Sequence, residues 1–91
     1  MSETQKAVVT VIGKDMVGIL SKVSAAVAEA NANVMEVTQS VLDGYFCMIM
    51  ILDITAADKS IDEMQALIGS HVPDMVVHVM HENIFNSMHR I

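Results

Sequence analysis

Four histidines and a few serines are the side chains in this sequence that could bind a metal ion or attack a substrate. His78 and His81 lie nearest to each other, but a spacing of three turns their side chains to opposite faces of a strand. Two histidines on opposite faces cannot share one tetrahedral zinc ion, so we expect no metal site. Ser21 and Ser24 have no histidine near them in the sequence, so we expect no catalytic residue and no enzyme activity.

Cys47 is the single cysteine, which rules out an internal disulfide. It lies in an apolar run and is expected to be a small buried hydrophobe in a reducing cytosol. The first residues include no apolar leader segment, and no apolar run approaches the roughly 18 residues of a membrane span. We therefore expect a cytoplasmic protein without membrane contact. The nine methionines suit adaptable packing and need no cofactor.

The chain of 91 residues carries a formal net charge of −6, and its five lysines and arginines are scattered. Binding to nucleic-acid phosphates requires clustered cations, so we expect no direct contact with nucleic acid. Hydrophobic residues make up 53% of the sequence, which is more than one small core can bury. Part of this surface is expected to lie against another copy, which predicts a homo-oligomer, either a dimer or a larger assembly.

The first half of the chain alternates between strand and helix signals. Ala7–Ile12 is a continuous, mostly β-branched run, which is typical of a central strand. The loop Gly13–Gly18 follows, with Asp15 at the position expected for a helix N-cap. Asn31–Asn33 ends the helix that this loop begins. Its apolar stripe is Leu20, Val23, Val27 and Ala30.

A hairpin is expected in the middle of the chain. The segment Val34–Leu42 alternates between apolar and polar residues, which predicts a strand with one solvated face near a sheet edge. Asp43–Gly44 is a strong signal for a type I′ turn. The return strand, Tyr45–Ile54, is apolar on both faces and is expected to be central. One face of the alternating strand carries Met35, Val37, Gln39 and Val41.

A second helix and a last strand complete the pattern. Ser60–Glu63 matches a capping box, and Gly69 is the residue expected just after the helix. Pro73 precedes the last strand, Met75–His81. The helix stripe is Ile61, Met64, Leu67 and Ile68, and the tail residues Ile84, Phe85, Met88 and Ile91 also have helical spacing.

The order of these elements is βαββαβ, which predicts the ferredoxin-like α+β sandwich. Right-handed crossovers place both helices on one face of a four-stranded antiparallel sheet. We expect one domain, 1–91, with a core over about 6–82 and a tail over 83–91. The opposite face of the sheet carries apolar residues such as Cys47, Ile49 and Ile51 or their alternates, and we expect a second subunit or the tail to cover it.

This fold serves many functions, and several of them need residues that this sequence lacks. An RNA-recognition motif stacks bases on aromatic side chains, but the chain has one tyrosine and two phenylalanines. A metallochaperone of this fold needs two cysteines. A phosphate site needs several arginines, and Arg90 in the tail is the single one here.

Two short motifs resemble the signatures of the ACT domain family. The loop Gly13–Leu20 is similar to (Asp/Asn)-x-x-Gly-(Ile/Val)-(Leu/Ile), and Ala32–Val34 is similar to the asparagine that enters the second strand. The resemblance extends over Lys6–Glu82. The segment Val37–Phe46 and the ending Met88–Ile91 resemble the small stand-alone ACT proteins (UPF0237). The chain is also similar to the ACT halves of the glycine cleavage system transcriptional repressor.

The family resemblance implies a ligand site at a subunit interface. Two subunits are expected to align edge to edge, with their first helices side by side and an amino acid bound between them. A helix N-terminus suits the carboxylate of such a ligand, and Asp15 could pair with its ammonium group. The ligand-binding residues that the resemblance implies are Asp15, Met16, Val17, Gly18, Ile19 and Asn33, all expected at one end of the first helix.

Simpler roles remain open for three of these residues. Asp15 would serve equally as a helix cap, and Gly18 as relief of crowding in the turn. Asn33 would serve as a left-handed residue at the end of the helix.

Three functions follow from this sequence, in order of support. The first is a regulatory module that senses an amino acid or similar small molecule at a homodimer interface. The second is an oligomer without a ligand, which docks on an enzyme or a transcription regulator. The third is gene regulation through such a protein partner, since the acidic charge argues against direct contact with DNA.

Overall fold

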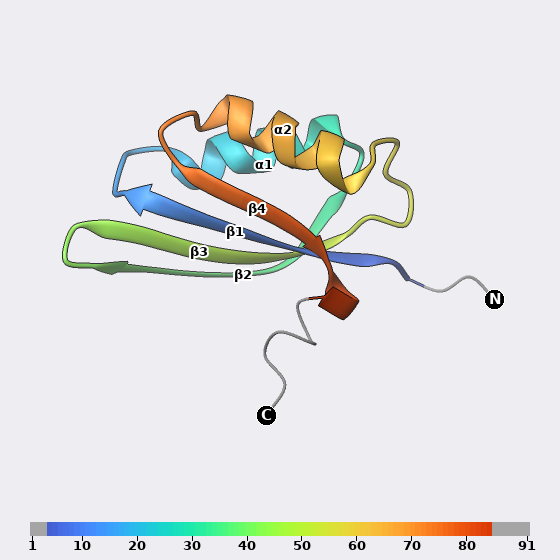
Figure 1. Cartoon of the computed structure of the whole chain (residues 1–91), viewed down its shortest axis with the longest axis horizontal. Helices are drawn as coiled ribbons and strands as arrows, with labels where there is room; N and C mark the ends of the chain where they lie inside the picture. The colour runs from blue at the N-terminus through green and yellow to red at the C-terminus, as the bar shows by residue number, and fades with distance from the viewer. Residues whose placement is uncertain (1–3, 85–91) are drawn as a thin grey trace.

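A computed structural model describes residues 4–84 and shows the expected element order. Its sheet is antiparallel in the order β2-β3-β1-β4, and both helices lie on one side of it (Figure 1). The elements are β1 (Lys6–Lys14), α1 (Ile19–Glu29), β2 (Asn33–Leu42), β3 (Tyr45–Asp53), α2 (Ile61–His71) and β4 (Val76–His81). The ferredoxin-like prediction is therefore confirmed. The predicted tail helix lies mostly in 85–91, outside the described residues.

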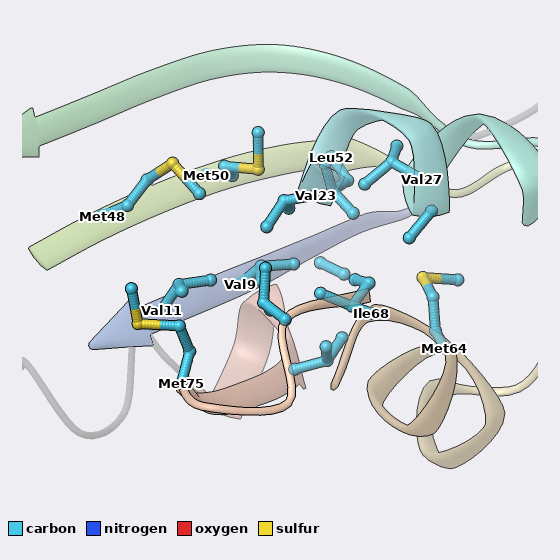
Figure 2. Packing of buried hydrophobic residues seen from close by; sticks show 14 of the residues in the cluster. Val9, Val11, Val23, Val27, Met48, Met50, Leu52, Met64, Ile68 and Met75 are labelled. Atoms are coloured by element: carbon cyan, nitrogen blue, oxygen red, sulfur yellow. The ribbon is translucent and has the colours of Figure 1, made fainter. Parts of the chain in front are cut away.

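The core lies between the helices and the inner face of the two central strands, β1 and β3. Alternate residues of β3 point into it, and Met48, Met50 and Leu52 are at most 1% exposed. They belong to one buried cluster with Val23 and Val27 of α1 and with Met64 and Ile68 of α2, which Figure 2 shows from close by. The continuous apolar patterns of β1 and β3 thus correctly predicted the central strands.

The edge strand β2 is the one element in which every residue is exposed. Neither helix buries its residues, although its neighbour β3 is buried on the inner side. The pairing with β3 shifts between Val34 and Glu36, so Met35 forms a bulge. Because the bulge adds a residue, Val34 and Val37 both face the helix side, and the expected grouping of Met35 with Val37 is wrong.

Local turn and cap signals fix the connections. Asp43 and Gly44 have φ of 53° and 81°, as a type I′ turn requires, so the predicted hairpin is confirmed. The capping box is also present, because Ser60 Oγ accepts from the Glu63 N–H at 3.1 Å and Glu63 Oε1 accepts from the Ser60 N–H at 2.8 Å. Gly69 lies inside α2, which continues to His71, so its predicted place after the helix is wrong.

The outer face of the sheet remains apolar and open. Its exposed apolar side chains include Ile12 of β1, Ile49 of β3 and Val76 of β4, which are 48%, 43% and 59% exposed. Val8, whose cross-strand partners are Ile51 and Met80, is buried at the other end of this face. The expectation that apolar side chains gather here is confirmed, and its covering by a second subunit or the tail stays a prediction.

Candidate functional site

A groove of about 440 Å³ lies where the start of α1 crosses above β2 and β3. One wall is the loop before α1 and the first turn of the helix, and the other is the inner face of the hairpin. The groove is lined by Met16, Gly18, Ile19, Leu20, Ser21, Gln39 and Phe46. Its volume falls within the range of ordinary small-ligand sites, roughly 300–1,000 Å³.

The start of α1 has no side-chain cap. Its N-cap is Gly18, with φ of 84°, and the first turn holds no acidic residue. The first intrahelical bond runs from the Lys22 N–H to the Gly18 carbonyl at 3.0 Å. The backbone N–H groups before Lys22 therefore present the positive end of the helix dipole without a side-chain acceptor. The expectation that Asp15 caps this helix is wrong, because the helix begins four residues later.

Gly18 is needed for its backbone conformation. No atom lies within 4 Å of the position that a Cβ would take, so relief of crowding is not its role. The left-handed φ of 84° is unfavourable for other residues, and it lets the chain leave β1 and turn into α1 beside the groove.

The structure brings together three of the six predicted ligand-binding residues. Met16, Gly18 and Ile19 line the groove. Val17 is 97% exposed and is not part of the lining. Asp15 is exposed next to the groove, and its N–H donates to the Gly44 carbonyl at 3.0 Å, which ties the loop to the hairpin turn.

Asn33 lies at the far end of α1, so the expected cluster of all six residues is wrong. It begins β2 opposite Asp53, whereas the groove lies near the other end of β2, at Gln39. The 11 residues of α1 separate these ends by about 16 Å. The left-handed residue at the helix end is Asn31, with φ of 59°, so that role does not belong to Asn33 either.

Four lining residues were not among the predicted ligand-binding residues. Leu20 and Ser21 follow the loop in the first helical turn, and Phe46 projects inward from β3. Gln39 had a visible signal, because it is a polar residue on the otherwise apolar face of an alternating strand. It is exposed in the single chain and contributes one of the two polar side chains of the lining.

The perturbed carboxylates lie away from the groove and have structural roles. Hydrogen bonds from the side chain and backbone of Thr55 hold the pKa of Asp53 below its ordinary value. Hydrogen bonds from the backbone and side chain of Ser60 lower the pKa of Glu63 in the capping box. Neither carboxylate lines the groove, so their shifts indicate local turn and cap stability.

Two of the three histidines in the described part of the chain, His71 and His81, link separate segments. His71 Nε2 lies 2.6 Å from Glu29 Oε2 and joins the C-terminal ends of the two helices. His81 Nε2 lies 3.1 Å from Gln5 Oε1, and its Nδ1 accepts from the Asn83 N–H. Within residues 4–84, no three histidine, cysteine or carboxylate side chains gather as a metal site would require. No helix in this same range has the length and apolarity to cross a membrane.

A second, smaller cavity of about 120 Å³ lies on the other side of the loop before α1. Met16 and Ile19 line both hollows and therefore separate them. The smaller cavity is completed by Lys22 and by the connection from α2 to β4, which supplies Val72, Pro73, Asp74 and Met75.

Sequence and structure comparisons agree on the relatives of this chain. It is 46% identical to a UPF0237 protein of Listeria monocytogenes, over 94% of this chain and 99% of that protein. Among solved structures, an ACT domain protein from Streptococcus pneumoniae matches with a TM-score of 0.71 and 30% identity, over 91% of this chain and 96% of that one. A putative glycine cleavage system transcriptional repressor shares the fold, with a TM-score of 0.68 and 23% identity over 88% of this chain and 46% of its own.

This chain matches almost the whole length of the first two of these relatives. Residues 5–80 match the sequence profile of the ACT domain, which covers most of the molecule. The chain belongs to the ACT domain family.

Proposed function

We propose that this chain is a regulatory module that binds an amino acid or a similar small molecule in the groove beside α1. The observation that carries the proposal is the position of this groove, between the uncapped start of a helix and a fully exposed edge strand. Uncapped N–H groups suit the carboxylate of the ligand, and exposed Asp15, the residue before the lining residue Met16, would supply a carboxylate for its ammonium group.

A second copy would complete the site. Gln39 brings β2 into the lining of the groove, and within residues 4–84 the outer backbone edge of β2 pairs with no further strand. Pairing of two β2 strands would extend the sheet and satisfy these edge groups. It would also bring the inner side chains Val37, Gln39 and Val41 of two copies together, beside their first helices. Ligand binding and association would then stabilise each other, because each helps to form the surface that the other needs.

A thermal-shift screen against the common amino acids tests the proposal, with mass measured in parallel by light scattering. A ligand present at about 100 times its Kd adds roughly 2.7 kcal/mol to stability. For a chain of this length that gain corresponds to a rise in Tm of about 10 °C or more. Absence of a shift with every amino acid would overturn the amino-acid form of the proposal.

Two aspartate substitutions separate loss of the site from loss of the fold. Leu20→Asp places a negative charge in the lining, at a first-turn position where aspartate favours the helix. Val17→Asp adds the same charge to the same segment, on a side chain that is 97% exposed and outside the lining. We expect Leu20→Asp to abolish ligand binding and Val17→Asp to retain it. Equal binding by both variants would mean that the groove is not the site.

The open outer face favours a second candidate function, an interaction protein without a ligand. Ile12, Ile49 and Val76 form an apolar surface that the helices do not cover. This function requires a stable oligomer, or docking on an enzyme or regulator, through that surface. It predicts no stabilisation by any small molecule, so the same screen distinguishes the two candidates.

A further inference from the structure

We infer that the groove selects amino acids with a bulky apolar side chain, and that Met16 is the adjustable wall that sets how large that side chain can be. The inference rests on the proposed function, because it names the ligand class of the same groove. It is drawn from the chemistry of the lining and from the empty space on both sides of Met16.

The lining is mostly apolar, with Ser21 and Gln39 as its two polar side chains. Ile19 and Phe46 form its fixed part, since they are 3% and 6% exposed and pack in the core. Met16 and Leu20 form its outer part and are 43% and 36% exposed. An apolar ligand side chain that covers these two residues removes both its own surface and theirs from water, which is the main source of affinity in such a site.

The same lining disfavours polar and charged ligand side chains. Ser21 and Gln39 supply the only polar side-chain groups among the lining residues of the described chain, and none of those residues is ionisable. A charged ligand side chain would lose water here without a counter-charge, and a small polar one would gain little contact. The ionisable side chain of Lys22 lines the smaller cavity, on the other side of Met16.

Met16 is the part of the wall that can move. It separates the groove of about 440 Å³ from the cavity of about 120 Å³, so its side chain has room on either side. Its flexible thioether chain adapts to irregular spaces. Ile19 also lines both hollows, but it is buried in the core cluster and its branched side chain has one strongly preferred rotamer in a helix. A large ligand side chain would therefore displace Met16 toward the α2–β4 connection and leave Ile19 in place.

Calorimetric titration of the full chain with a matched set of free amino acids tests the ligand class. Leucine and asparagine have the same number of side-chain atoms besides hydrogen, so they differ mainly in polarity. We expect leucine, methionine and phenylalanine to bind at least about tenfold more tightly than alanine, because each buried methylene-sized group adds affinity. We expect a similar preference for leucine over asparagine, and no binding of lysine or aspartate at concentrations that saturate with leucine.

The variant Met16→Ala tests the wall, with Val17→Ala as its matched control. Removing the Met16 side chain joins the two hollows, so the ratio of phenylalanine affinity to leucine affinity should rise by about fivefold. Val17→Ala changes the neighbouring residue, which is 97% exposed and outside both linings, and should leave the ratio unchanged. Because Met16 is half-exposed, its removal should leave the fold intact, which the Tm without ligand checks.

The outcomes separate this inference from the proposed function. Two results together support both parts of the inference. Leucine binds more tightly than asparagine, and the ratio of phenylalanine affinity to leucine affinity rises in Met16→Ala but not in Val17→Ala. Tightest binding of a small polar or charged amino acid would overturn the ligand class and leave the proposed function standing. An unchanged ratio in Met16→Ala would overturn the role of the wall. If no amino acid binds, the proposed function fails, and the inference fails with it.

Discussion

Two neighbouring residues of β3 allow a direct test of which face of the sheet is buried in solution. Met50 points toward the helices and is 0% exposed, whereas Ile49 points to the outer face and is 43% exposed. We compare the substitutions Met50→Ala and Ile49→Ala, which truncate side chains of similar size on adjacent positions of one strand. The pleat of the strand, which turns one side chain into the core and the other outward, is the main reason that their costs should differ.

The expected magnitudes follow from the two environments. Truncation of a fully buried methionine costs about 2–5 kcal/mol of stability. The whole free energy of unfolding of a domain of this length is roughly 5–14 kcal/mol. Met50→Ala should therefore lower Tm by at least about 8 °C. Folding of the single chain buries a little over half of the surface of Ile49. Ile49→Ala should therefore cost about 1 kcal/mol and lower Tm by roughly 4–8 °C.

Urea and thermal unfolding, followed by circular dichroism at two protein concentrations, provide the assay. A cost below about 1 kcal/mol for Met50→Ala would refute the assigned core. A cost for Ile49→Ala as large as that for Met50→Ala would mean that the outer face is covered in solution. The concentration series then identifies the cover, because stabilisation by a second copy grows with protein concentration and stabilisation by the chain's own tail does not.

Three further predictions address the cap, the loop and the edge strand. Ser60→Ala should cost about 1 kcal/mol at neutral pH. Hydrogen bonds from the backbone and side chain of Ser60 lower the folded pKa of Glu63, so the carboxylate stabilises the fold above the ordinary glutamate pKa and loses that contribution as pH falls through the lowered value. Alanine keeps the backbone donor and removes the hydroxyl that caps the Glu63 N–H, so in urea unfolding the difference between the two proteins should narrow in acid but persist. Gly18→Ala should cost about 1–2 kcal/mol in urea unfolding, because its φ of 84° is strained for alanine; no cost would mean that the loop adopts another conformation. If two β2 strands pair, Val37→Lys should halve the mass measured by light scattering. The Tm extrapolated to low protein concentration should change little, and an unchanged dimer mass would place the interface elsewhere.

The sequence predicted the features that depend on neighbouring residues. The Asp43–Gly44 turn and the Ser60–Glu63 capping box are confirmed, because each involves only a few adjacent positions. The two central strands were also predictable, since a strand buried between neighbours carries apolar residues continuously.

The groove was predictable only on the side formed by one continuous segment. Met16, Gly18 and Ile19 lie within four consecutive residues at the end of the loop and the start of α1, so a motif could identify them. Gln39 and Phe46 enter the site because α1 crosses above the hairpin, which is a property of three-dimensional packing. The bulge at Met35 changes which β2 residues face that side, and alternation in the sequence gives no sign of it.

The proposed association would bring the misplaced Asn33 back to the groove. Within one chain, Asn33 and the groove lie at opposite ends of β2. If two β2 strands pair antiparallel along their full length, position 33 of one copy comes opposite position 42 of the other, which is the end that borders the groove. Asn33 of one copy would then lie near the groove of the other copy, so each site would be formed by residues of both copies. A ligand that contacts both copies binds the paired state more tightly than the separate chains, so it shifts the equilibrium toward pairing by that difference in affinity. The signal of such a module would be its state of association, and the exposed β2 edge would be the element whose pairing the ligand controls.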